Sequence, residues 1–189
     1  MQKRSHTLLA AALLKNQNGL RARRYELAFL FGSFEPDCNP LSYLKGSLRS
    51  RKFRGHNYTN SDHYIANRIQ RLQNRKKAWT CWQYYTLGKL THYLADAFTY
   101  PHNENYQEGL LDHHQYENAL RLYFAQCLAC RRLPEEGDCR DLPGALDLLH
   151  RRYLQDRSSM EQDVDYILAA TTLLMEGCHP SAAWSGKIA

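Results

Sequence analysis

The chain of 189 residues has 43% hydrophobic and 23% charged residues, and its formal net charge is +6. This length is typical of one domain and allows a core that is stable without disulfides or oligomerisation. The composition is normal for a soluble globular protein. No stretch is long and apolar enough to span a bilayer, which argues against an integral membrane protein.

Helix is favoured along the whole chain, because prolines and glycines are few and β-branched residues are scarce. The first predicted helix spans 5–18, with Ser5 as its N-cap and Gly19 as its stop. Lys3 and Arg4, followed by the apolar residues 8–14, faintly resemble a secretory signal. The apolar run is short and lacks a clear A-x-A cleavage site, so we interpret it as the first helix of the fold and expect a cytoplasmic protein.

Apolar residues recur at helical spacing in six further segments. Their expected ranges are 20–31, 61–76, 80–98, 110–132, 143–156 and 159–177. The stretch 32–60 is rich in Gly, Pro, Asn and Ser and is predicted to be irregular, and a loop this long is usually functional or disordered. Without an internal repeat or domain boundary, the sequence predicts an all-α fold, a single-domain multi-helix bundle over residues 1–189.

Basic residues gather in two clusters. The first contains Arg21, Arg23 and Arg24, and the second contains Arg49, Arg51, Lys52 and Arg54. The positive charge suggests an anionic partner such as phospholipid headgroups or nucleic acid. The alternative, a solvated basic surface, is the more common reason for such a charge, so charge alone does not decide between them.

The six cysteines are scattered along the chain. Cys127 and Cys130 form a C-x-x-C pattern in a helical stretch, which is typical either of a redox pair or of half a zinc site. Two small apolar residues packed on a helix face are the favoured interpretation. Without an export signal, reduced thiols are expected.

Histidines and acids recur at helical spacing in the central part of the chain. His92 and Asp96 are four residues apart in one predicted helix, and His113 and Glu117 are four residues apart in the next. Side chains at this spacing share one helix face, so each pair can bind one divalent ion. His102 lies between the two pairs, just past a helix end.

Each pair alone is more often a surface pair or a hydrogen-bonded core histidine. Two pairs and a further histidine within one short stretch favour a shared metal site between adjacent antiparallel helices. Nitrogen and oxygen ligands without thiolate suit catalytic zinc. The sequence therefore predicts a zinc site with His92, Asp96, His102, His113 and Glu117.

In this stretch the sequence resembles the bacterial zinc-dependent phospholipases C, the family of clostridial alpha-toxin. The matching segments are 87–96, 100–102 and 113–117, and upstream 32–37, which contains a Pro-Asp pair, 55–58, which reads Gly-His-Asn-Tyr, and Ser5-His6. The order of the histidines and acids in these segments is highly specific to the family. The resemblance covers about residues 5–117.

The resemblance implies a helical fold of the phospholipase C and single-strand nuclease type, with two or three zinc ions. It implies three groups of ligands: Asp37, His56, His92 and Asp96 for one ion, His6 with a bridging Asp96 for a second, and His102, His113 and Glu117 for another. The Gly-His-x-Tyr context favours His56 over the rival His63. The position of Glu117 favours His113 over its neighbour His114.

Two features depart from the family. Its members bind a zinc through the amine and carbonyl of an N-terminal tryptophan, whereas this chain has only five residues before His6. We therefore expect Met1 to fall short, which leaves a His6 site that is completed by water, weakly occupied or empty. In the choline pocket, Phe53 fits the family pattern, but Cys38 replaces an aromatic residue and no N-terminal acid matches. A preference for choline is therefore not expected.

The resemblance implies a zinc-dependent phosphodiester hydrolase of the phospholipase C type that uses a metal-activated water. Asp37 is the expected catalytic residue, and Phe53, Arg54 and Tyr58 are expected to bind substrate. The expected partner is a phospholipid or another phosphodiester, with peripheral membrane contact; nucleic acid is less favoured, and no obligate protein partner is indicated. Two alternatives stay open: a single-strand nuclease or 3′-nucleotidase, and a non-catalytic metal-binding protein.

Overall fold

The computed structural model describes residues 1–17, 19–38, 58–103, 110–131, 133, 141–156 and 159–178, with backbone only at 58–62 and 110–111. In these ranges the regular structure is entirely helical, with seven α-helices, a short 3₁₀ turn and no strand. The prediction of an all-α fold is confirmed. No described helix combines the length and the hydropathy that a membrane crossing requires.

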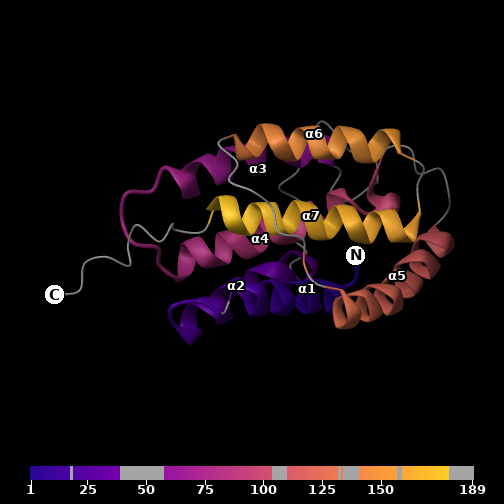
Figure 1. Cartoon of the computed structure of the whole chain (residues 1–189), viewed down its shortest axis with the longest axis horizontal. Coiled ribbons are helices and arrows are strands. Elements are labelled where there is room, and N and C mark those ends of the chain that lie inside the picture. The colour runs from indigo at the N-terminus through magenta and orange to yellow at the C-terminus, as the bar shows by residue number, and fades with distance from the viewer. Residues whose placement is uncertain are drawn as a thin grey trace.

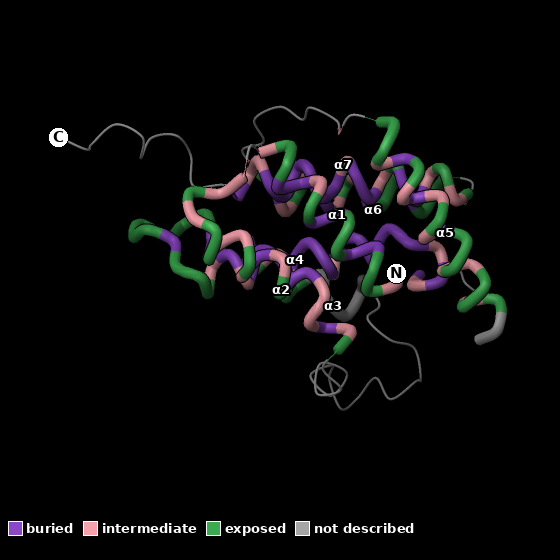
Figure 2. The backbone as a smooth tube through the Cα atoms, turned by 90° about the horizontal axis from the view of Figure 1, so that it is seen from below, coloured by how far each residue is buried: buried purple, intermediate pink, exposed green. Residues whose placement is uncertain are grey.

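Helix α4 is the central element of the bundle and contacts α1, α2, α3 and α7 (Figure 1). In chain order the elements are α1 Lys3–Asn16, α2 Arg23–Cys38, α3 Tyr58–Gln73, α4 Cys81–Ala97, η2 Tyr100–His102, α5 Leu110–Cys130, α6 Leu142–Gln155 and α7 Met160–Cys178. Most residues of α4 from Tyr84 onward are buried (Figure 2). A polar side chain on its inner face is therefore surrounded by other helices.

A capping box fixes the start of α4. The Thr80 hydroxyl accepts a hydrogen bond from the Trp82 backbone N–H, and the Gln83 side chain accepts one from the Thr80 backbone N–H. These bonds satisfy N–H groups that a helix start otherwise leaves unpaired. Because the start of α4 is fixed, the register of His92 and Asp96 on this helix is fixed with it.

Helix α2 extends further than the sequence pattern predicted. We expected it to end before Gly32, whereas it continues to Cys38 and includes Pro36 in its last turn. Gly32 is a packing position, because a Cβ atom there would lie 2.2 Å from the Tyr85 backbone oxygen on α4. Gly88 has the same role from the other side, since its Cβ would lie 2.1 Å from the Phe29 oxygen. The close contact between α2 and α4 places the last turn of α2 against the ligand-bearing half of α4.

Candidate metal centre

Helix α4 presents His92 and Asp96 on its buried face. His92 Nε2 lies 3.2 Å from Asp96 Oδ2. His92 Nδ1 lies 3.0 Å from the Ser33 carbonyl oxygen of α2. Since a carbonyl can only accept, Nδ1 donates this hydrogen bond, and in the neutral imidazole the lone pair is then on Nε2, on the side of Asp96. A hydrogen bond of this kind orients imidazoles that bind metals.

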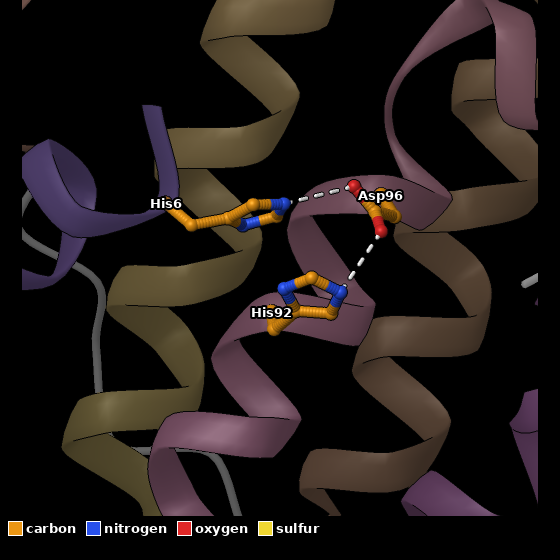
Figure 3. A group of neighbouring side chains, drawn as sticks. All are labelled: His6, His92 and Asp96. Atoms are coloured by element: carbon orange, nitrogen blue, oxygen red, sulfur yellow. Dashed lines mark ion pairs between the residues drawn. The ribbon is translucent and has the colours of Figure 1, made fainter. Parts of the chain in front are cut away.

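Helix α1 brings His6 to the same carboxylate. His6 Nε2 lies 3.2 Å from Asp96 Oδ1, and the two imidazole rings stack with centroids 4.0 Å apart. Figure 3 shows Asp96 beside both rings, with one oxygen directed at each. His6, His92 and Asp96 are close enough for one ion to bind all three, and we call them the inner group.

Asp37, in the last turn of α2, borders the inner group. Its Oδ1 lies 3.6 Å from His92 Nε2, and its Oδ2 lies 3.9 Å from His6 Nε2. Burial raises the pKa of Asp37 to about 6. Asp37 was expected in an irregular segment, and its position instead follows from the extension of α2.

A second set of ligands comes from η2 and α5. His102 Nε2 lies 3.4 Å from Glu117 Oε1, and His113 Nε2 lies 3.3 Å from the same oxygen. These three residues also meet the spacing for a single ion, and we call them the outer group. Burial raises the pKa of Glu117, but the hydrogen bond from His102 and the nearby positive groups outweigh burial and lower it to about 2.

The amine of Met1 is buried between the two groups. Its nitrogen lies 2.6 Å from Asp96 Oδ1, 3.1 Å from His102 Nε2 and 3.3 Å from Glu117 Oε1. The expectation that Met1 falls short is therefore wrong. Burial lowers the pKa of this amine, but the two carboxylates outweigh burial and raise it. The space between the inner and outer groups accepts a positive charge.

The donor atoms present fit zinc. Neither ring nitrogen of the buried His6 makes a hydrogen bond within the described residues, and neither does Asp37 Oδ2. Buried polar atoms without a hydrogen bond are costly unless they bind something. Burial and the neighbouring His92 lower the pKa of His6 to about 3, which keeps its imidazole neutral, as metal binding requires. Imidazole nitrogens and carboxylate oxygens with no thiolate suit catalytic zinc.

Asp163 of α7 supports the outer group from behind. Its Oδ2 accepts hydrogen bonds from the Tyr100 backbone N–H, at 2.9 Å, and from the Tyr116 hydroxyl, at 2.7 Å. Its Oδ1 accepts a hydrogen bond from the Tyr153 hydroxyl at 2.7 Å. Tyr100 begins the turn that carries His102, and Tyr116 precedes Glu117. One buried carboxylate thus joins both elements of the outer group.

Asn103 fixes the other end of the same turn. Its side-chain amide donates to the carbonyl oxygens of Ala97 and Thr99, at 3.1 and 3.0 Å. Its Oδ1 lies 3.2 Å from His150 Nε2. Sequence reasoning missed Asp163, because it has no acid or histidine partner at helical spacing. The one sequence signal was the position of Asp163, an acid within the apolar pattern of a predicted helix.

The remaining candidate residues are described in part or not at all. His56, Phe53 and Arg54 lie outside the described residues, and Tyr58 is described only as the first residue of α3. The rivals His63 and His114 are both exposed. In the C-x-x-C pattern, Cys127 is buried and Cys130 is exposed, and both are free thiols.

Residues 5–172 match the model of the family described as zinc dependent phospholipase C. The match begins at Ser5, ends in α7 and includes every element that carries a ligand of the inner or outer group. No curated protein and no solved structure matches the chain.

Proposed function

The chain belongs to the zinc-dependent phospholipase C family, and from this we propose that it is a zinc-dependent hydrolase of phosphodiesters, with phospholipids as its substrates. One observation carries the proposal. The inner and outer groups lie so close that a single buried amine contacts Asp96 of the first and His102 and Glu117 of the second. A site of this kind can place two positive charges against one phosphate group.

The described side chains have separate roles in this proposal. When bound, zinc supplies a Lewis acid for the phosphate oxygens and lowers the pKa of water that it coordinates. Ser33 holds His92 in the orientation that directs Nε2 at the centre, through the hydrogen bond to Nδ1. Asp96 contacts His6 and His92 directly, and the Met1 amine links it to His102 and Glu117 of the outer group.

Asp37 is the candidate that handles the proton. Its carboxylate lies at the edge of the inner group and is partly exposed, so both water and substrate can reach it. We propose that the Asp37 carboxylate orients a water molecule and accepts its proton as the water oxygen forms a bond to phosphorus. The bond from phosphorus to the diacylglycerol oxygen breaks, and the proton passes to that oxygen, which leaves as an alcohol.

Metal analysis combined with a substrate panel tests the proposal. The purified protein should contain zinc and should hydrolyse phosphatidylcholine or another phospholipid, as well as bis(4-nitrophenyl) phosphate. A chelator should abolish both activities, and added zinc should restore them. Cleavage of single-stranded nucleic acid without cleavage of any phospholipid would favour the nuclease alternative. Bound zinc without any hydrolysis would favour a non-catalytic metal-binding protein.

A further inference from the structure

A stripe of large apolar side chains is exposed on the neighbouring helices α2 and α4. Leu27, Phe31 and Trp82 are 57%, 52% and 62% exposed. The Tyr85 ring lies between the two helices, with its centroid 5.9 Å from that of Phe31 and 5.3 Å from that of Trp82. Leu27 lies one turn before Phe31 on α2. We call Leu27, Phe31, Trp82 and Tyr85 the aromatic stripe.

The two helices run in the same direction, so their N-termini meet at one end of the bundle (Figure 1). The Tyr25 and Tyr84 rings stack there with centroids 4.6 Å apart, and Cys81 Sγ lies 4.0 Å from the Arg24 carbonyl oxygen. The aromatic stripe therefore begins where α2 and α4 begin.

Basic residues surround this end of the bundle. They are Arg21, Arg23, Arg24, Arg75, Lys76 and Lys77. All six are exposed, and none forms an ion pair with another described residue. We call them the basic end. The sequence from 63 to 95 contains no acidic residue, and Glu26 accepts the Leu20 backbone N–H at 3.1 Å. The six exposed cations at this end therefore outnumber the two half-buried carboxylates there, Glu26 and Glu176, whose neighbour Gly177 accepts a hydrogen bond from the Gln73 side chain.

We propose that the aromatic stripe and the basic end form the surface through which the protein docks on an anionic lipid bilayer. Aromatic and aliphatic side chains gain free energy when they enter the headgroup region, and arginine and lysine are attracted to anionic lipids. The proposal rests on the proposed function, because a phospholipid substrate in the bilayer is the reason for the protein to dock there.

The position of the surface relative to the metal centre supports this use. The Phe34 ring lies 5.6 Å from that of Phe31, and the Lys3 ammonium lies 4.6 Å above the Phe34 ring. Asp37 follows Phe34 by about one helical turn. The exposed apolar surface thus continues along α2 to the exposed edge of the inner group, where a phospholipid leaving the bilayer would first meet the ligands.

Fluorescence quenching tests the docking surface directly. The zinc-loaded protein is mixed with phosphatidylcholine–phosphatidylglycerol vesicles whose acyl chains carry bromine, and tryptophan emission is read before turnover begins. We expect quenching that rises with the phosphatidylglycerol content and falls with added salt. With Trp184 replaced by phenylalanine in every protein compared, the further change Trp82→Phe should remove most of this quenching, because Trp79 is buried.

Two pairs of matched variants locate the surface. Leu27→Ser with Phe31→Ser should weaken vesicle binding by about tenfold or more. Its control, Leu148→Ser with Leu154→Ser, removes two α6 side chains that are 51% and 41% exposed and should bind like the parent protein. Arg21→Glu with Arg23→Glu should weaken binding by a similar factor, whereas Arg151→Glu with Arg152→Glu changes the net charge equally and should have little effect.

Several outcomes would overturn the docking surface. Unquenched emission on anionic vesicles would do so, and so would equal losses in the test and control pairs. Binding of single-stranded oligonucleotide, or self-association, that depends on Leu27 and Phe31 while vesicles are ignored would assign the surface to another partner. Hydrolysis of bis(4-nitrophenyl) phosphate needs no bilayer, so it reports on the proposed function separately. Its rate should be the same in all four double variants.

Discussion

The inner and outer groups contain the same kinds of ligand but differ in burial. The side chains of His6, His92 and Asp96 are almost fully buried, whereas those of His102, His113 and Glu117 are between 12% and 25% exposed. The inner ligands lie on two long helices of the core. The outer ligands lie on the short turn η2 and in the first turns of α5.

The difference shows two ways of holding a metal ligand in place. Packing holds the inner group, because the glycine contact between α2 and α4 fixes the Ser33 carbonyl against His92. Hydrogen bonds hold the outer group, because Asp163 joins its turn to α5. A change in core packing should therefore affect the inner group, and a change in the hydrogen bonds should affect the outer group.

The largest effect is expected at the carboxylate that faces both groups. Asp96→Asn should lower turnover of bis(4-nitrophenyl) phosphate by about two orders of magnitude or more, because a neutral amide cannot balance two cations. Circular dichroism should show that the helical fold is retained. His63→Asn, at an exposed histidine, is the control and should keep full activity. Near-normal turnover in Asp96→Asn would refute the shared role.

The packing of the inner group is tested at Gly32. Gly32→Ala places a methyl group 2.2 Å from a backbone oxygen, and backbone cannot move aside easily. We expect a loss of about 1–3 kcal/mol in the free energy of unfolding, measured in urea, and weaker zinc binding by the inner group. Gly177→Ala is the control, because its Cβ meets only the end of the Leu142 side chain, at 2.8 Å. Equal losses in both variants would contradict the packing argument.

The hydrogen bonds of the outer group are tested at Asp163. Asp163→Asn keeps the shape of the side chain but removes one acceptor, so zinc binding by the outer group should weaken by about 10–100-fold. Calorimetric titration should show this loss in one of the binding steps only. Tyr153→Phe removes the one donor that comes from neither η2 nor α5, so its effect should be smaller. A uniform loss at every site would mean that Asp163 acts only on global stability.

The smallest expected effect is a difference between the two groups in the rate at which they release zinc. A chelator added to the zinc-loaded protein should remove zinc from the partly exposed outer group before it removes zinc from the buried inner group. Release followed with a zinc-sensitive dye should therefore have two phases. Asp163→Asn should accelerate the faster phase and Gly32→Ala the slower one. A single phase in all three proteins would contradict the difference between the groups.

The sequence predicted the helices and the ligand pairs because both depend on local spacing. His92 and Asp96, like His113 and Glu117, share a helix face at a spacing of four residues whatever the tertiary structure is. The end of α2 could not be predicted, since Gly32 is usually a stop signal and only the partner helix shows that it is a contact. Asp163 could not be predicted either, because its partners come from three other elements, and two of them, Tyr100 and Tyr116, are 63 and 47 residues away.

Anomalous diffraction at the zinc absorption edge, from crystals of the zinc-loaded protein, would show whether the two groups bind zinc. We expect one peak among His6, His92 and Asp96 and another among His102, His113 and Glu117, both adjoining Asp96. Zinc peaks bound elsewhere, or His6 and His92 directed away from any peak, would contradict this expectation.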